Sequence, residues 1–226
     1  MNKLVELCKD NKIIAHRGCW DNTNPENSYE AIKVAVEKGY AVELDIHMTL
    51  DKRMIVFHDH RLYRMCGEKG IVEDMTSADL TKFQLKNTEH TIPLLTDILQ
   101  LIKGKSLLFI ELKPRNNVIE MCKLLHNELT DYKGDIVIIG FDPIGIKYMK
   151  ELGYTVALSM KFPKLAKDFN PDGSLCLHRT IPQNDNKRNK YPPFIAWTIN
   201  SEKAKNRLDD KCIALIYNTK NFNHKL

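Results

Sequence analysis

The strongest constraint on the fold is a repeated alternation of short apolar runs with amphipathic stretches along the chain. The apolar runs are rich in β-branched residues, and strands that alternate with helices are typical of βαβ units and a parallel sheet. Eight such strands indicate a closed barrel rather than an open sheet. We therefore predict an α/β fold, a (β/α)8 barrel of the TIM type. The expected strands are residues 13–15, 41–46, 107–110, 136–139, 155–158, 175–177, 194–199 and 213–216, and the clearest helices are 28–38, 118–129 and 144–152.

One apolar run does not fit the alternation. Residues 54–57 follow the second strand after only a short polar stretch. A connection that short can join antiparallel strands but cannot make a parallel crossover. We therefore expect residues 46–60 to form a hairpin-like excursion after the second strand, which returns His58 to the barrel end that holds Glu43 and Asp45.

The segment before the seventh strand is a poor helix sequence. Residues 182–193 contain three prolines around a run of Asn, Asp, Lys and Arg, and proline, Asn and Asp are unfavourable in a helix interior. We expect a loop crossover here, with one helix of the ring missing.

Length and charge bound the organisation and the partners. The 226 residues contain no linker or low-complexity tract, which favours a single domain over residues 1–226. The net charge of +5, from 34 Lys and Arg against 29 Asp and Glu, is spread along the chain. Nucleic-acid binding calls for a basic stripe with aromatic or helix-turn-helix signals, so no nucleic-acid partner is expected.

The apolar residues and the cysteines bear on location. No run of about 18 apolar residues occurs, so no stable membrane insertion is expected. The first 11 residues mix charged and apolar residues and do not resemble a signal peptide. The six cysteines show no CxxC pair and no zinc-site spacing. These features predict a cytoplasmic protein with free thiols.

Polar residues gather where the predicted strands end. In a parallel barrel, the C-terminal ends of the strands face the active site. Residues two apart on a strand point to the same side, which applies to Glu43 and Asp45 and to Glu111 and Lys113. The residues expected at this end are His16, Arg17, Glu43, Asp45, His58, Glu111, Lys113 and Trp197.

Three of these residues are acidic. Carboxylates that point into a barrel are costly to hold without partners. A hard divalent cation with oxygen ligands, Mg²⁺ or Ca²⁺, would offset that cost at Glu43, Asp45 and Glu111. The alternative is that these acids pair with Arg17 and Lys113.

Two histidines are expected at the same mouth, although a single histidine is more often a packed or surface residue. Phosphodiester cleavage needs a base for the attacking oxygen and an acid for the leaving one, and imidazole suits both near neutral pH. Arg17 can bind a phosphate through two hydrogen bonds, and Lys113 can add a point charge. These residues indicate a barrel for metal-assisted phosphate-ester chemistry.

The order of these residues resembles the glycerophosphodiester phosphodiesterase family. The likeness covers roughly residues 12–200, and the series His-Arg-Gly, Pro-Glu-Asn, Glu-x-Asp and His-Asp is specific as a set. The matching segments are residues 14–18 (Ile-Ala-His-Arg-Gly), 24–28 (Asn-Pro-Glu-Asn-Ser), 42–46 (Val-Glu-Leu-Asp-Ile), 57–59 (Phe-His-Asp), 109–113 (Phe-Ile-Glu-Leu-Lys) and 196–200 (Ala-Trp-Thr-Ile-Asn).

The resemblance implies a (β/α)8 barrel with three metal ligands, an acid–base pair, two phosphate-binding residues and a wall of the substrate pocket. The metal ligands would be Glu43, Asp45 and Glu111, and the acid–base pair would be His16 and His58. Arg17 and Lys113 would bind the phosphate. Trp197 would be the wall of the pocket, for which a core position is the alternative. In the family's usual mechanism a glycerol hydroxyl attacks the phosphorus and expels the alcohol. The resulting cyclic phosphate is opened by water to glycerol 3-phosphate.

Residues beside the motifs have expected supporting positions. Glu26 and Asn27 are expected to brace the loop after the first strand, and Asn27 or Ser28 to cap the following helix. Solvent exposure is expected for His47 and for His60, although His60 could also line the mouth.

The chain also departs from the family pattern. The family usually has a glycine in the turn after the Glu-x-Asp strand, where residues 51–53 read Asp-Lys-Arg. The family's closing segment, of the type Gly-Val-Asp-Gly-Ile-Ile-Thr-Asp, corresponds to residues 211–218, Lys-Cys-Ile-Ala-Leu-Ile-Tyr-Asn.

Three functions remain open from the sequence. The first is hydrolysis of small glycerophosphodiesters, such as glycerophosphocholine, to glycerol 3-phosphate. The second is a phospholipase D-like cleavage of lysolipids, which would need an apolar channel at the mouth. The third is a non-catalytic barrel that binds a phosphorylated ligand or a partner protein.

Overall fold

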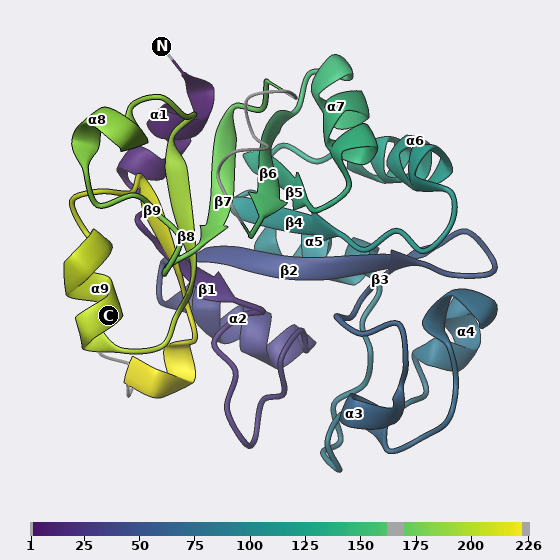
Figure 1. The fold of residues 1–226 in the computed structure, drawn as a ribbon. Helices are drawn as coiled ribbons and strands as arrows, with labels where there is room; N and C mark the ends of the chain where they lie inside the picture. Colours follow the sequence, from purple (N-terminus) through teal and green to yellow (C-terminus); the bar gives the residue numbers. More distant parts are fainter. Residues whose placement is uncertain (1, 162–169, 223–226) are drawn as a thin grey trace.

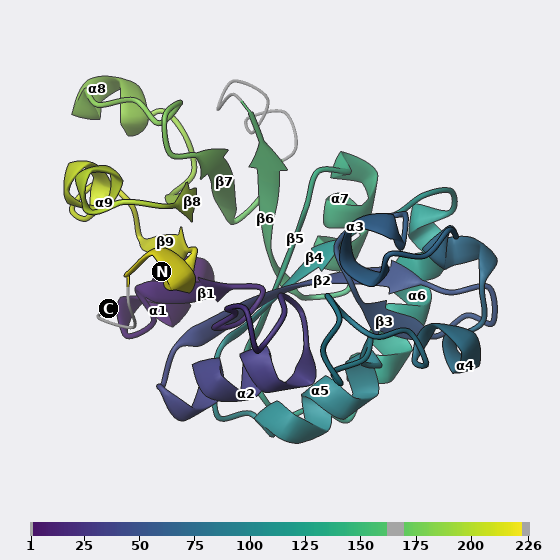
Figure 2. The same cartoon turned by 90° about the horizontal axis from the view of Figure 1, so that it is seen from below.

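The computed structural model describes residues 2–161 and 170–222 (Figures 1 and 2). The strands are β1 Ile13–His16, β2 Ala41–Met48, β3 Met54–Val56, β4 Leu108–Leu112, β5 Ile136–Gly140, β6 Thr155–Met160, β7 Gly173–Leu177, β8 Phe194–Ile199 and β9 Ala214–Tyr217. The helices are α1 Lys3–Lys9, α2 Tyr29–Glu37, α3 Tyr63–Cys66, α4 Ser77–Leu80, α5 Leu95–Ile102, α6 Val118–Leu129, α7 Pro143–Glu151, α8 Asp185–Arg188 and α9 Glu202–Leu208, with 3-10 turns η1 Val72–Asp74 and η3 Thr219–Phe222.

Eight parallel strands close into a barrel, as predicted. Their order is β1-β9-β8-β7-β6-β5-β4-β2, and pairing between β1 and β2 completes the ring. The seam between the first and last strands aligns Ile14 with Ile216, so the altered C-terminal segment still closes the barrel.

The excursion after the second strand is also confirmed. β3 pairs antiparallel with the end of β2, where Ile46 aligns with Val56. The chain between β3 and α5 then forms α3, η1 and α4, which lie beside the barrel (Figures 1 and 2). This segment has its own small apolar cluster, to which Phe57, Leu62 and Leu80 belong.

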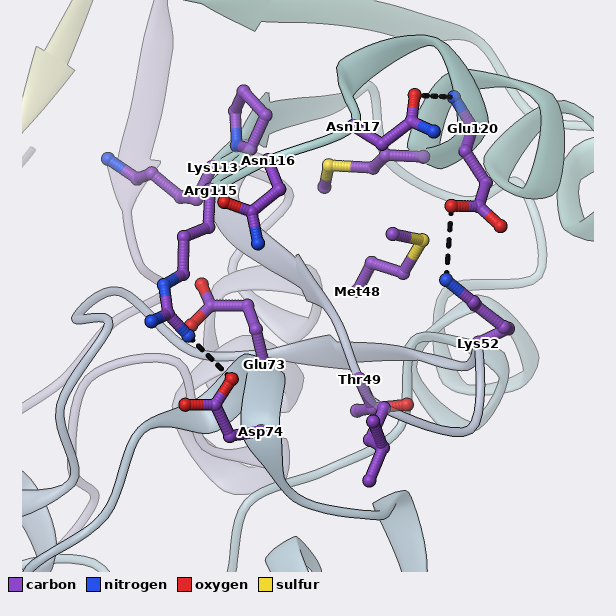
Figure 3. A pocket seen from close by; sticks show the side chains of 13 residues that line it. Met48, Thr49, Lys52, Glu73, Asp74, Lys113, Arg115, Asn116, Asn117 and Glu120 are labelled. Atoms are coloured by element: carbon purple, nitrogen blue, oxygen red, sulfur yellow. Dashed lines mark hydrogen bonds and ion pairs between the residues drawn. The ribbon is translucent and has the colours of Figure 1, made fainter.

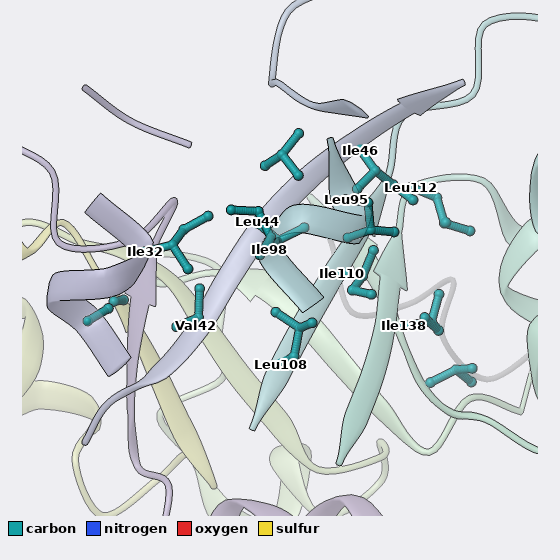
Figure 4. Packing of buried hydrophobic residues seen from close by; sticks show 14 of the residues in the cluster. Ile32, Val42, Leu44, Ile46, Leu95, Ile98, Leu108, Ile110, Leu112 and Ile138 are labelled. Carbon is teal, nitrogen blue, oxygen red and sulfur yellow. The ribbon is translucent and has the colours of Figure 1, made fainter. Parts of the chain in front are cut away.

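The alternation of side chains along the strands produces two apolar layers. Outward-facing residues pack beneath the helices, and Figure 4 shows Val42, Leu44 and Leu108 under α2 and α5. Inward-facing residues such as Ile14 and Phe109 form a separate cluster inside the barrel, which Leu4 and Cys8 of α1 join. The barrel interior is therefore filled with apolar side chains near the N-terminal ends of the strands, and the inward-facing polar side chains lie near the C-terminal ends.

The helices follow their local signals. α2, α6 and α7 lie where the amphipathic stretches predict them, and Ser28 caps α2 by accepting a hydrogen bond from the Ala31 N–H. Between β7 and β8 the described chain has only the single turn α8, which agrees with the expected loss of a ring helix. α5 was not among the predicted helices.

The helices do not suggest a membrane span. Within residues 2–161 and 170–222, no helix combines the length and the apolar character needed to cross a bilayer.

Candidate active site

Side chains from seven barrel strands or the residues just after them, and from the excursion, surround a small cavity at the C-terminal end of the barrel. Its volume is about 80 Å³. Its lining residues are His16, Arg17, Glu43, His58, Glu111, Lys113, Phe141, Leu175, Trp197 and Ile216. The structure thus brings together seven of the eight residues predicted for this end, and the eighth, Asp45, contacts two of them.

Strand register places the acidic and basic groups side by side. The pairing of β1 with β2 aligns His16 with Glu43, and the pairing of β2 with β4 aligns Asp45 with Glu111. Aligned residues of neighbouring parallel strands project to the same face, which here is the barrel interior. The spacing within each strand predicts only that its own polar residues share a face, and the register between strands brings the residues of different strands side by side.

The turn after β1 depends on an unusual backbone conformation. Arg17 and Gly18 have φ values of 57° and 81°. This turn directs the Arg17 backbone N–H to Glu43 Oε2, at 3.0 Å. A Cβ atom on Gly18 would lie 2.6 Å from the carbonyl carbon of Ala31, so the position also requires the absence of a side chain. The geometry accounts for the glycine of the His-Arg-Gly motif.

The three acids converge on one another in the barrel interior. One oxygen each from Glu43, Asp45 and Glu111 lies within 4.8 Å of the others. The same acids also contact cations: Lys113 Nζ lies 3.0 Å from Asp45 Oδ1 and 2.5 Å from Glu111 Oε1. The acids therefore lie close enough together to bind a metal ion, and they also pair with basic residues.

The acids differ in their electrostatic surroundings. Burial, followed by the charges of Asp45 and Glu111, raises the pKa of Glu43 well above its usual value. Burial also acts to raise the pKa of Asp45, but Lys113 and Arg17 outweigh it and hold that pKa below its usual value. Burial and Asp45 raise the pKa of Glu111. When all three carboxylates are ionised, they carry one negative charge more than Arg17 and Lys113 supply, and a divalent cation fits their donor chemistry.

His16 is held from the far side of the barrel seam. Its Nδ1 lies 3.1 Å from Asn218 Oδ1, an atom that can only accept, so Nδ1 carries the proton and Nε2 is left to take up another. Nε2 lies 4.0 Å from Glu43 Oε2. Burial, followed by the charge of Arg17, lowers the pKa of His16 to about 4.

His58 reaches the cavity from the end of the excursion. Its Nδ1 lies 2.5 Å from Asp59 Oδ1, which again leaves Nε2 as the free ring nitrogen. Burial lowers the pKa of His58, whereas the nearby Asp45 charge opposes that change. Both rings are therefore neutral at neutral pH, and in each Nε2 is the nitrogen that carries no proton.

The loop after β1 is braced as predicted, and one residue of the brace was not anticipated. Glu26 Oε1 accepts hydrogen bonds from Arg17, at 2.6 Å, and from Arg64, at 2.7 Å. Arg64 Nε also donates to Asp59 Oδ2 at 2.6 Å, so it connects the loop to the partner of His58. No motif in the sequence marked Arg64, because its partners lie on other elements.

Two more residues that the sequence did not assign to the site belong to it. Asn27 Nδ2 donates to Asp45 Oδ2 at 2.9 Å, a contact more specific than the general bracing expected of it. Phe141, after β5, stands edge-on to Trp197 with ring centroids 5.7 Å apart. Trp197 lines the cavity and also packs against the inner apolar cluster, so its side chain is both a wall of the cavity and part of the core.

The expectation that His47 is exposed is wrong. Its side chain is 0% exposed, because β2 directs it to the same face as Asp45 and the segment after β3 covers that face. Its Nδ1 lies 2.7 Å from Glu73 Oε1. His60 is exposed, as expected, although its ring also contacts Glu73.

A second cavity of about 240 Å³ adjoins the first and shares Lys113 with it. It lies between the end of β2, η1 and the chain that leads into α6 (Figure 3). Charged residues face one another across it, and Lys52 pairs with Glu120 at 3.0 Å. Glu73 is part of its wall.

Comparison with known proteins agrees with this geometry. Residues 16–150 match the model of the "Glycerophosphoryl diester phosphodiesterase family". A "Glycerophosphodiester phosphodiesterase" from Bacillus altitudinis is 35% identical over 114 residues, which are 47% of this chain and 46% of that protein. A lysophospholipase D from Homo sapiens is 30% identical over 121 residues, 48% of this chain and 38% of that protein. The chain thus spans about half the length of the curated relatives it matches.

Solved structures extend the likeness of fold over nearly the whole chain. A phosphodiesterase from Oleispira antarctica, in complex with the product sn-glycerol-3-phosphate, superposes with a TM-score of 0.85 at 20% identity and covers 93% of this chain and 94% of its own. A glycerophosphodiester phosphodiesterase from Parabacteroides distasonis gives 0.80 at 21% identity and covers 96% of both chains. These likenesses show a shared fold, and together with the match over residues 16–150 they lead to one conclusion: this chain belongs to the glycerophosphoryl diester phosphodiesterase family.

Proposed function

We propose that this protein hydrolyses glycerophosphodiesters to glycerol 3-phosphate and an alcohol, with a divalent metal ion and two histidines. The observation that carries the proposal is that His16 and His58 line the same cavity as Glu43 and Glu111 of the acidic cluster. Two ring nitrogens free to move protons beside a cation-binding set are what phosphodiester cleavage requires.

We propose Mg²⁺ or Ca²⁺ as the metal, held by Glu43, Asp45 and Glu111. Three carboxylates and no softer ligand favour a hard cation. When bound, the cation would neutralise charge on the phosphate and hold the glycerol hydroxyls. Lys113 and Arg17 limit the repulsion among the acids, as their contacts with Asp45 at 3.0 and 3.2 Å show.

The histidines would move the protons. One neutral ring accepts the proton of the attacking glycerol hydroxyl at Nε2 as the hydroxyl oxygen bonds to phosphorus. The other ring, which takes up a proton at Nε2 from water once the anionic phosphate lies beside it, gives that proton to the alcohol oxygen as the phosphorus–oxygen bond breaks. The cyclic phosphate is then opened by water with the two roles exchanged. Asn218 and Asp59 fix the rings through Nδ1, so that both reactions use Nε2.

Arg17 and Lys113 would bind the phosphate. Nε of Arg17 is buried, lies 3.2 Å from Asp45 Oδ2 outside hydrogen-bond geometry, and has no hydrogen-bond partner among the described residues. It therefore retains a donor for a phosphate oxygen. Burial acts to lower the pKa of Lys113, but Asp45 and Glu111 outweigh it and raise that pKa, so the ammonium stays charged.

The proposal extends to the organisation of the chain. We propose that residues 1–226 form one barrel domain, because β9 pairs with β1 across the seam. A cytoplasmic setting is proposed because none of the six cysteines forms a disulfide. The partner is a small glycerophosphodiester, with glycerophosphocholine as the first substrate to try.

The test is release of glycerol 3-phosphate from a panel of glycerophosphodiesters with Mg²⁺, Ca²⁺ or EDTA. We expect metal-dependent release that falls on the order of 100-fold or more in His16→Ala and His58→Ala, since each removes a proton-transfer group. His90→Ala, which lies outside the cavity, is the matched control. Full activity of the His16 variant would contradict these roles, and ligand binding without turnover in any metal would favour the non-catalytic barrel.

A second candidate, cleavage of lysolipids, is favoured by one observation at the mouth. Phe141, which lines the cavity, is 46% exposed, and Ile144, three residues further along the chain, is 60% exposed, so an acyl chain could lie against them. Choline release from lysophosphatidylcholine and from glycerophosphocholine separates the two substrates. A preference for the lysolipid that Phe141→Ser abolishes would support this candidate, and phosphorus NMR would detect a cyclic product.

A further inference from the structure

A second cluster of metal-ligand side chains lies outside the acidic site. His47 from β2, His60 from the segment after β3 and Glu73 from η1 each place one ligand atom within 4.8 Å of the others. His47 Nδ1 and His60 Nδ1 lie 2.7 and 2.5 Å from the same oxygen, Glu73 Oε1. The two imidazole rings meet edge to face, with centroids 4.9 Å apart.

His47 meets an acceptor at each ring nitrogen, the carbonyl oxygen of His58 at Nε2 and Glu73 Oε1 at Nδ1. Its Nε2 lies 3.0 Å from the carbonyl oxygen of His58, which can only accept, so Nε2 carries a proton. In the neutral ring Nδ1 then has a lone pair, and this lone pair points at Glu73 Oε1. Donation of the remote ring N–H to a backbone carbonyl is the usual arrangement of a histidine that binds a metal through its other nitrogen.

Glu73 supplies an independent observation. Its side chain is 10% exposed, and its Oε2 is buried without a hydrogen-bond partner among the described residues. A buried carboxylate oxygen without a donor is unfavourable. A cation that contacts the carboxylate would compensate for the missing donor and for the facing lone pair of His47 together.

We propose that His47, His60 and Glu73 form a second metal site, selective for a first-row transition dication such as Zn²⁺. Two imidazole nitrogens and one carboxylate suit Zn²⁺, whereas the all-carboxylate cluster of the active site suits a hard cation. Three protein ligands leave a position for water, which the exposed side of His60 can admit. The site does not depend on the proposed reaction.

The surrounding backbone holds the three ligands in place. The carbonyl oxygen of His60 accepts the N–H of Val72 at 3.0 Å, and Arg61 forms an antiparallel bridge with Ile71, so the segments that bear His60 and Glu73 are paired. His47 is fixed by the sheet. Glu73 also lines the 240 Å³ cavity (Figure 3), which provides a path for the ion.

A metal at this site would position a catalytic residue. His47 contacts the backbone of His58 directly, and the other two ligands come from the segment that follows it. The ion would thus join β2 to the covering segment and restrict the His58 backbone. His47 is in this sense a positioning residue, since it acts on the reaction through His58.

The test is a Zn²⁺ titration of the metal-stripped protein in excess Mg²⁺, which occupies the acidic cluster. We expect one Zn²⁺ per chain in the wild type and in Glu43→Gln, and affinity lower on the order of 100-fold or more in His60→Ala and Glu73→Gln, because each removes a ligand. His60 is 48% exposed, so its replacement does not threaten folding. His90→Ala and Glu68→Gln are matched controls outside both clusters.

Two spectroscopic measurements complete the test. Co²⁺ in place of Zn²⁺ should give visible bands that His60→Ala weakens, and Zn²⁺ should shift the NMR signals of the His58 ring in the wild type but not in that variant. Absence of Zn²⁺ binding in excess Mg²⁺, as a simple His47–Glu73 ion pair would give, overturns the proposal. So does equal Zn²⁺ affinity in the wild type and His60→Ala. Both results are independent of whether any diester is cleaved.

Discussion

His16 at the end of the first barrel strand is hydrogen-bonded to Asn218, which follows the last strand, with 3.1 Å between Nδ1 and Oδ1. This contact spans the seam at which the barrel closes. It fixes the ring through a neutral amide, whereas His58 is fixed through the carboxylate of Asp59. The two histidines therefore differ in the charge of the group behind them.

Replacement of that amide by a carboxylate should raise the pKa of His16. In Asn218→Asp a negative charge next to Nδ1 would stabilise the imidazolium, and an opposite charge at this distance shifts a pKa by about 1–3 units. Starting from about 4, the pKa should move up towards its ordinary value. NMR titration of the His16 ring measures it, with Asn218→Ala as the control that removes the contact without adding charge. An unchanged or lower pKa in the Asp variant would contradict the assigned contact.

Glu26 should contribute to stability in a pH-dependent way. Burial acts to raise its pKa, but hydrogen bonds from Arg64 and the charge of Arg17 outweigh it and lower the pKa to about 2. A depressed pKa stabilises the fold above the unfolded value of about 4.3, by roughly 3 kcal/mol, and this contribution is lost as pH falls towards 2.

Urea unfolding of wild type and Glu26→Gln tests this dependence. The stability difference between them should shrink by about 1 kcal/mol between pH 6 and pH 3.5, because part of the wild-type carboxylate becomes protonated in the unfolded chain. Glu68→Gln, at an exposed position, should leave the pH dependence as in the wild type. A constant difference across this range would show that Glu26 is not held ionised by its arginines.

Gly18 should tolerate no side chain, unlike another glycine of similar backbone conformation. Gly39 has φ of +71° and open space around it, so Gly39→Ala should cost about 1 kcal/mol for the left-handed conformation alone. Gly18→Ala adds a clash with the Ala31 backbone at 2.6 Å and should cost at least about 2 kcal/mol more. Chemical denaturation measures both variants, and equal losses would refute the clash.

The turn after β2 should be improved by glycine. Lys52 has φ of 63°, at the turn where the family usually has a glycine. Lys52→Gly should therefore raise stability by about 0.5–1 kcal/mol, because the half-exposed ion pair that it loses contributes little. Lys52→Ala is the matched control: it loses the same ion pair, retains the strained backbone and should not be stabilised. Thermal melts of the two variants give the comparison.

Local features of the sequence were sufficient to predict the elements of the barrel. The β-branched runs coincide with β1, β5 and β8 because strand preference is a property of neighbouring residues. The excursion was predictable because a connection of a few residues cannot cross over to a parallel strand. α5 was not predicted, although it is amphipathic, because Leu94 at its N-cap has no side chain that could cap the helix.

Contacts between distant segments were not predictable in the same way. Arg64 joins Glu26 to Asp59, and its role depends on how the segment after β3 folds over the loop that follows β1. His47 shares a strand face with Asp45, which its spacing indicates, but its burial depends on that same covering segment. A strand pattern specifies which face a side chain takes and not what lies against that face.

The sequence by itself therefore determined the barrel, the excursion and the set of polar residues at the strand ends, because these follow from local periodicity and chain length. Only the tertiary structure decided that Asp45 lies beside Glu111, that Asn218 holds His16 and that His47 meets His60 and Glu73. These relationships arise from strand register, barrel closure and the packing of an inserted segment. Each depends on the free energy of the whole fold rather than on the residues adjacent in the chain.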